Sequence, residues 1–294
     1  MGAITLGIFL CFLAAFFKTG KSVTTKVAAT ETDEYITSFA TRVVAVAFAA
    51  LLIALIGSVS IPTAPEFWLF FLLNVASSTA TIIYLTRGFK LADVSIAAAL
   101  LAFVPVSTMF PAMIVLGQIP TLISGTGVVL VTVGAYVLNL HERNEGVFEP
   151  IRAIIFDPGA RAIMIAVLVA SPMPTLDVLG LQHTTELMWM GLTSIATATI
   201  LLVIVSQKSS ATVVETKNEW KILTIVGLFN ALLVLTQLLA YAVIDVVYVQ
   251  AIKRVSILCS IVVGYLWFNE GHVRQRLLGG VIMIVGVFLI VFGL

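Results

Sequence analysis

Charged residues are scarce in this sequence. Aspartate, glutamate, lysine and arginine make up 11% of its 294 residues, against about 25% in an ordinary soluble domain. Hydrophobic residues make up 60%, which is more apolar surface than a water-soluble fold of this length can bury. The composition therefore excludes a soluble domain and predicts an all-α integral membrane protein whose surroundings are the lipid bilayer.

Residue types that carry out chemistry are also few. The two cysteines, Cys11 and Cys259, lie inside apolar runs, and the three histidines, His141, His183 and His272, lie in predicted loops. No nucleophile, catalytic base or cluster of metal ligands stands out, so we expect neither an enzyme nor a bound metal or cofactor. With a net charge of +1 and no basic tail, we expect no nucleic-acid partner either.

Ten apolar runs of about 17–25 residues predict ten transmembrane helices. None of the runs alternates as a barrel strand would. The predicted spans are Ala3–Ala28, Tyr35–Ile56, Phe67–Leu85, Ala92–Leu116, Leu122–Leu140, Arg161–Leu181, Leu187–Val205, Ile222–Ile244, Val246–Phe268 and Leu277–Leu294.

The two halves of the chain resemble each other. The longest polar interruption, residues 141–161, divides the spans five and five. Sliding the chain along itself by 152 residues superimposes Trp68 on Trp220, Asp93 on Asp245, Gly127 on Gly279 and Gly134 on Gly286. Because each copy has an odd number of spans, the copies enter the membrane from opposite sides. We therefore predict two inverted five-helix repeats, 1–142 and 161–294, joined by a loop at 143–160.

Lys253 and Arg254 are the least expected residues of the chain. They lie near the middle of the predicted span Val246–Phe268, with no acid one helical turn away. A cation at that depth costs about 2.5–3.5 kcal/mol. We favour a water-filled cavity that holds an anionic ligand, because arginine offers a bidentate fork and lysine a point charge. The alternative is neutralisation by another helix.

Arg42 is a third candidate, about eight residues into the second span and without a nearby acid. It could instead be a structural cation bonded to carbonyls at a helix end. Four polar residues could line the same cavity, or serve as helix–helix hydrogen bonders and interfacial aromatics. They are Gln237, Tyr241, Tyr248 and Gln250.

Glycine and proline positions indicate interruptions of the helices. Gly20 in the first span and Pro172 in the sixth are related by the offset of 152 residues, and paired interruptions of this kind are typical of a binding site or hinge. The residues expected to break or hinge their helices are Gly20, Pro172, Pro174, Pro105 and Pro111. Lys18 and Lys21 flank the first of these positions, and we expect them to reach the membrane surface.

These features together resemble the drug/metabolite transporter superfamily, in its EamA-type branch of ten helices. A typical repeat of that family ends with a proline-containing helix, a G-E-R-x-S turn and a glycine-bearing last helix. The corresponding segments here are LGQIP, residues 116–120, and FNEGHVRQR, residues 268–276. Gln118 replaces the usual acid and Asn269 the usual glycine. One segment, AIKRVSILCSIV at residues 251–262, resembles the ninth helix of the plastid phosphate-translocator branch, in which a Lys-Arg pair holds the phosphate of the substrate.

The resemblance implies a secondary transporter that works by alternating access, with its site at the midplane between the repeats. We expect an anionic small-molecule substrate: a phosphorylated sugar, a nucleotide sugar, an organic acid or an amino acid. The alternatives are an exporter of neutral or cationic metabolites or drugs and, from another class, a scaffold or flippase subunit that does not itself transport. We expect a multi-pass protein of the cytoplasmic (inner) membrane of a prokaryote, and a homodimer is left open.

Membrane orientation is indicated by the loops. Lysine and arginine gather in loops 1–2, 3–4, 5–6, 7–8 and 9–10, which the positive-inside rule places in the cytoplasm. Both termini would then lie on the far side. Ten-helix relatives are usually drawn with cytoplasmic termini, so the two indications differ.

Overall fold

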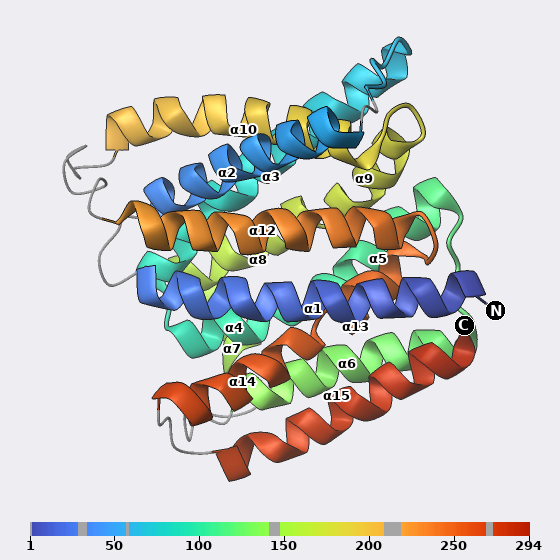
Figure 1. The fold of residues 1–294 in the computed structure, drawn as a ribbon. Helices are drawn as coiled ribbons and strands as arrows, with labels where there is room; N and C mark the ends of the chain where they lie inside the picture. Colours follow the sequence, from blue (N-terminus) through green and yellow to red (C-terminus); the bar gives the residue numbers. More distant parts are fainter. Residues whose placement is uncertain (1, 29–33, 57–58, 141–147, 209–218, 269–272) are drawn as a thin grey trace.

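The computed structural model describes residues 2–28, 34–56, 59–140, 148–208, 219–268 and 273–294, and within them every regular element is a helix (Figure 1). The helices are α1 (Gly2–Ala28), α2 (Glu34–Ile56), α3 (Pro65–Leu91), α4 (Val94–Leu101), α5 (Val104–Leu116), α6 (Leu122–Leu140), α7 (Glu149–Phe156), α8 (Pro158–Ala170), α9 (Met173–Leu181), α10 (Glu186–Lys208), α12 (Trp220–Tyr241), α13 (Val246–Ile252), α14 (Val255–Phe268) and α15 (Val273–Gly293). His141, His272 and Asn269 lie outside the described residues.

The all-helical membrane architecture is confirmed, whereas the count of ten spans stays a prediction. Seven described segments are long and apolar enough to cross a membrane, and Leu122–Leu138 and Leu278–Gly293 are shorter apolar helices. Large apolar side chains cover the outside of the bundle, where lipid would surround them. Examples are Leu55, Ile114, Leu122 and Phe292, each more than 70% exposed.

Three of the predicted spans are each built from two half-helices. The pairs are α4 with α5, α8 with α9, and α13 with α14. Pro105 lies in the first turn of α5, Pro172 is the N-cap of α9 and Pro174 lies in its first turn. A proline there is tolerated because the first amides of a helix have no intrahelical acceptor, whereas in a helix interior it removes a hydrogen bond.

The third break, between α13 and α14, contains no proline. Lys253 and Arg254 themselves occupy the junction. The backbone there tightens into three-residue turns: the Arg254 amide donates to the Ala251 carbonyl at 3.0 Å, and the Ser256 amide to the Lys253 carbonyl at 3.2 Å. Such a local 3₁₀ turn often marks a functional hinge.

The expected breaks at Gly20 and Pro111 are wrong. α1 runs without interruption through Gly20. A Cβ at that position would lie 2.4 Å from Cε1 of Phe229, so the glycine allows α12 to approach α1 closely. Pro111 lies inside α5, which continues to Leu116.

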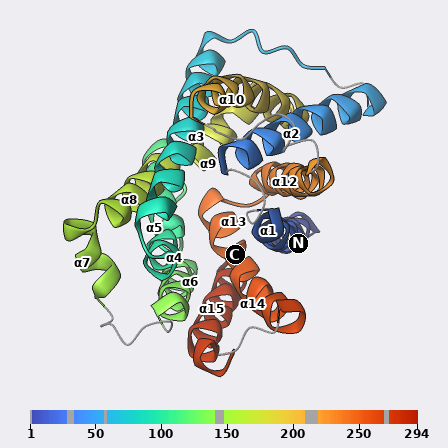
Figure 2. The same ribbon diagram turned by 90° about the vertical axis from the view of Figure 1, so that its left-hand side faces the viewer.

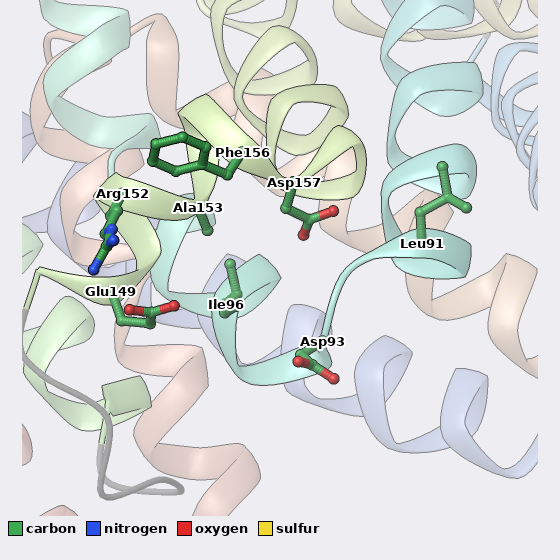
Figure 3. A pocket seen from close by; sticks show the side chains of 8 residues that line it. All are labelled: Leu91, Asp93, Ile96, Glu149, Arg152, Ala153, Phe156 and Asp157. Atoms are coloured by element: carbon green, nitrogen blue, oxygen red, sulfur yellow. The ribbon is translucent and has the colours of Figure 1, made fainter.

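The segment between the halves is more ordered than a loop. It contains α7, and α8 begins at Pro158 rather than at Arg161, because the Asp157 carboxylate caps it. The two oxygens of Asp157 accept from the amides of Gly159 at 2.8 Å and Ala160 at 3.2 Å. A pocket of about 520 Å³ lies between this corner and the turn from α3 to α4 (Figure 3). Its lining includes Asp93, Glu149, Arg152, Phe156 and Asp157.

Contacts between the halves repeat under the offset of 152 residues. A Cβ at Gly127 would lie 2.6 Å from the Gly286 carbonyl oxygen, and one at Gly134 would lie 2.7 Å from that of Gly279. Each contact maps onto the other, because 127 and 134 become 279 and 286. α6 and α15 are therefore equivalent helices that cross in opposite directions, so the two-fold axis relating the halves is perpendicular to them. Equivalent helices that run antiparallel are what an inverted repeat requires.

α13 occupies the middle of the bundle (Figures 1 and 2). It packs against α1, α5, α6, α12 and α15, and every residue from Val246 to Arg254 is buried. Both termini lie at one end of the molecule (Figure 1). The junction of α13 and α14 therefore lies deep inside the protein, between its two halves.

Candidate functional site

Lys253 and Arg254 are interior residues with different surroundings. Their side chains are only 8% and 9% exposed. The Lys253 ammonium donates a hydrogen bond to Oε1 of Gln237 on α12. The buried Nε of Arg254 has no hydrogen-bond partner among the described residues. Buried polar groups are rarely left in that state, so Arg254 is the most conspicuous donor of the interior.

The remaining polar candidates each have a partner. Nε2 of Gln250 donates to the Tyr241 hydroxyl at 2.5 Å, and the Tyr248 hydroxyl lies 2.8 Å from Oγ of Ser124 on α6. Gln250, Tyr241 and Tyr248 are all buried. These bonds tie α13 to its neighbours, which is the helix–helix role that the sequence left open for them.

Arg42 meets both a hydroxyl and an acid. Its guanidinium donates to Oγ of Ser78 on α3 at 2.8 Å. Asp177 on α9 lies within electrostatic range of it, so the expectation that Arg42 lacks a nearby acid is wrong. The sequence could not show this, because α2 and α9 belong to different halves.

Asp177 is the site residue that the sequence analysis missed. Its Oδ1 accepts two neutral hydrogen bonds, from Nδ2 of Asn74 at 2.9 Å and from Nε1 of Trp189 at 2.8 Å. Arg42 and Lys253 lie within its electrostatic range, but Asp177 forms no ion pair within 4.0 Å with any described residue. The available signal was that Asp177 is the single acid in the predicted span 161–181.

Lys18 and Lys21 face the interior, so the expectation that they reach the membrane surface is wrong. Nζ of Lys21 donates to Oδ1 of Asn230 on α12 at 2.8 Å. Lys18 lies within electrostatic range of Lys253 and Arg254. α1 presents both lysines on one side because residues three apart lie on the same helix face.

The interior is strongly unbalanced in charge. Its described cations are Lys18, Lys21, Arg42, Lys253 and Arg254, whereas the acid among the described interior residues is Asp177, which lies within electrostatic range of Arg42 and Lys253. Under the offset of 152 residues the five cations correspond to Ala170, Met173, Ser194, Leu101 and Ala102. Each cation therefore has an uncharged residue at its equivalent position in the other half, so the positive charge does not follow the symmetry of the repeats. An excess of positive charge of this kind generally favours an anion over a cation.

Gln118 caps the N-terminus of α13, at the end opposite Lys253. Gly117 takes a left-handed conformation, with φ of 66°, and ends α5. Oε1 of Gln118 then accepts from the Val246 amide, the first of α13, at 3.1 Å. Asp245 holds the N-cap position without a side-chain cap bond, and partial burial raises the pKa of its carboxyl. The neutral glutamine that departs from the family pattern thus caps a helix beside a carboxylate.

No ligand set for a metal occurs in the part of the chain that the structure describes, where no three residues among histidine, cysteine, aspartate and glutamate gather suitably. The donors of the site are instead cations, amides and hydroxyls. These groups suit the recognition of an anionic organic molecule.

The two-repeat helical architecture and an enclosed polar site define a multi-pass membrane transporter fold. The sequence model of the EamA-like transporter family matches residues 5–140 and 158–292, so the chain belongs to this family, whose members are transporters. One solved crystal structure superposes with a TM-score of 0.80 over 96% of this chain and 95% of its own, at 13% sequence identity, which shows the fold alone. No curated protein matches the sequence.

Proposed function

We propose that the protein carries a small organic anion across the membrane by alternating access, and that the anion binds at the junction of α13 and α14. The observation that carries the proposal is the charge imbalance of the interior. Among the described residues, five cations share that interior with one carboxylate, Asp177, within a bundle whose outer surface is apolar. A buried cation without a partner destabilises the protein, and a bound substrate anion would offset that destabilisation.

The donors match an oxyanion in detail. Arg254 offers a planar fork for carboxylate or phosphate. Lys253 has two further ammonium protons beyond the one given to Gln237. Lys18, Lys21, Arg42 and Asp177 are partly exposed although they lie in the interior, which supports a water-filled space between them. Phosphorylated sugars, nucleotide sugars, organic acids and amino acids all carry a suitable group.

The packing of the half-helices supports alternating access. At the end that carries the termini, α13 packs against α5, and the Gln118–Val246 and Ser124–Tyr248 hydrogen bonds tie α13 to the first half there. Under the repeat the equivalent pair is α14 with α4, and these two have no comparable packing. We infer a state in which the site is closed toward the termini and open toward the opposite end, between inverted repeats of residues 1–142 and 161–294.

The runner-up is export of neutral or cationic compounds. Asp177, the one interior acid among the described residues, is the feature that favours it, because a carboxylate can hold a cationic drug. The five described cations of the interior outnumber that carboxylate. The anion hypothesis therefore fits the charges better.

Reconstitution tests the proposal. Purified protein is placed in phosphatidylcholine vesicles, and counterflow exchange is measured with a panel of labelled phosphate esters, carboxylates, amino acids and cationic drugs. We expect exchange of an anion, which Arg254→Gln abolishes. The matched control is Arg87→Gln, because Arg87 is an exposed arginine on α3. Exchange of cations alone, or an Arg254→Gln variant that exchanges anions normally, would contradict the proposal.

A further inference from the structure

Lys18 is an interior cation to which the proposed function assigns no role of its own. Among the described residues its ammonium forms no hydrogen bond or ion pair. α1 is nevertheless fixed at this point, because the Thr19 hydroxyl lies 3.2 Å from the Ser256 carbonyl, in the first turn of α14, and 3.0 Å from the Ala15 carbonyl. This contact holds the part of α1 that carries Lys18 against the first turn of α14.

Arg254, in the other half of the chain, lies within electrostatic range of Lys18. It is 9% exposed, and its buried Nε has no partner among the described residues. Neither Lys18 nor Arg254 has a described acid among the charges that act on it. Like charges in the interior repel, so an anion bound between them would be stabilised.

Asp177 does not supply the missing charge. It lies within electrostatic range of Arg42 and Lys253, and its Oδ1 is engaged by Asn74 and Trp189. Lys21 has its own neutral acceptor in Asn230. Two of the five cations, Lys18 and Arg254, are thus left for the ligand alone.

We propose that Lys18 is the second cation of the anion site, and that Lys18 and Arg254 together hold a doubly charged oxyanion, such as a phosphate monoester, in preference to a singly charged one. This inference rests on the proposed function and names the charge of the group that the substrate presents. Arginine binds two oxygens through its fork, and lysine binds the third as a point charge. A singly charged group leaves one buried cation uncompensated, and that penalty produces the selectivity.

The test uses two probes of the same shape and different charge. Methyl phosphate is a dianion above its pKa of about 6, whereas methyl sulfate carries one charge. Binding of each to protein in phosphatidylcholine vesicles is measured by calorimetry at a pH well above that pKa. We expect the unmodified protein to prefer methyl phosphate by about 10-fold or more.

Substitutions at Lys18 separate selectivity from folding. Lys18→Met keeps the length of the side chain and removes the charge, so the thermal midpoint without ligand should be unchanged or higher. We expect it to weaken methyl phosphate binding by about 10- to 100-fold and methyl sulfate binding far less. Lys18→Arg should keep the preference. The control is Lys221→Met, an exposed lysine in the first turn of α12.

The outcomes distinguish this inference from the proposed function. Equal binding of the two probes by the unmodified protein overturns the two-cation site, and so does a preference for methyl phosphate that survives Lys18→Met. If methyl sulfate binding still depends on Arg254 in either case, the proposed anion site stands. Loss of Arg254 dependence for both probes overturns both. Vesicles containing phosphatidic acid identify the source of the ester. Displacement of methyl phosphate by this lipid assigns the site to a headgroup, and no displacement assigns it to a soluble molecule; the chemistry proposed is the same in either case.

Discussion

Asp177 balances part of the charge of the site at the scale of single residues. Among the described residues its carboxylate receives hydrogen bonds from Asn74 and Trp189 alone, so its negative charge acts on Arg42 and Lys253 through space. A substrate anion would do the same more closely. We infer that Asp177 stabilises the empty site and competes with the substrate for the cations.

Asp177→Asn tests this role. The amide oxygen can still accept from Asn74 and Trp189, so the packing is retained while the charge is lost. We expect the empty protein to be destabilised by at most about 1 kcal/mol, because Asp177 is partly exposed and forms no ion pair within 4.0 Å with any described residue. Anion affinity should rise. Thermal midpoints and calorimetric affinities measure both effects, with Glu66→Gln on the exposed face of α3 as the control. An unchanged affinity would show that Asp177 lies outside the field of the site.

The cations illustrate what a sequence can show of a buried site. Lys253 and Arg254 stand out because they interrupt an apolar run, and no knowledge of neighbours is needed to see that they are costly there. Asp177 lies near the end of its predicted span, and Lys18 and Lys21 belong to a group of lysines that continues to Lys26, near the end of theirs. Distance along a helix gives depth but neither the face nor the neighbouring helix. The contact of Lys21 with Asn230, 209 residues away, decides its role.

At the scale of the helices, close approach between the halves depends on glycine at particular positions. Along α6, Gly134 meets the backbone of α15, where a Cβ would lie 2.6 Å from the Met283 nitrogen. Gly125 on the same helix has more room, since its nearest neighbouring atom would be 3.6 Å away. The two glycines form a matched pair within one element.

Gly134→Ala should therefore destabilise the protein, and Gly125→Ala should not. Overpacking against a backbone costs about 1–3 kcal/mol, whereas alanine at an unstrained helix position is worth up to about 1 kcal/mol over glycine. Thermal unfolding in detergent reports both variants. Equal midpoints for the two would mean that α6 and α15 can separate freely, contrary to the observed packing.

Prolines marked two of the three helix breaks and misled elsewhere. A proline in the first turn of a new helix costs nothing, as at Pro105 and Pro174, yet Pro111 remains inside α5. The junction of α13 and α14 has no proline or glycine to announce it. The offset of 152 residues could have found it, because Arg254 corresponds to Ala102 at the break between α4 and α5.

At the scale of the whole molecule, the two ends differ in charge. The termini share one end (Figure 1). Exposed lysines and arginines such as Arg87, Lys90, Arg161 and Lys221 lie at the helix ends opposite, although Lys18 and Lys21 of α1 no longer count toward them. The positive-inside rule places that basic end in the cytoplasm. In the state that we infer, which is closed toward the termini, the site would then be open to the cytoplasm.

We therefore expect both termini to be non-cytoplasmic. Fusing the C-terminus to an enzyme active only outside the cytoplasm should give signal, and fusing it to one active only inside should give none. A reversed pattern would turn the molecule over and make the open end face outward, without changing the site.

The crossing of α6 and α15 has a mechanical consequence. Four glycines bring these backbones together symmetrically about the two-fold axis. When one half rocks against the other, points on that axis move least. The crossing of α6 and α15 therefore acts as the pivot of the motion. A disulfide engineered across α6 and α15 should leave counterflow exchange intact. A disulfide that joins α5 to α13 should instead lock the protein in one conformational state and stop the exchange. Exchange is measured before and after oxidation, in a variant without Cys11 and Cys259. The comparison distinguishes the pivot, formed by α6 and α15, from the contact between α5 and α13 that must open.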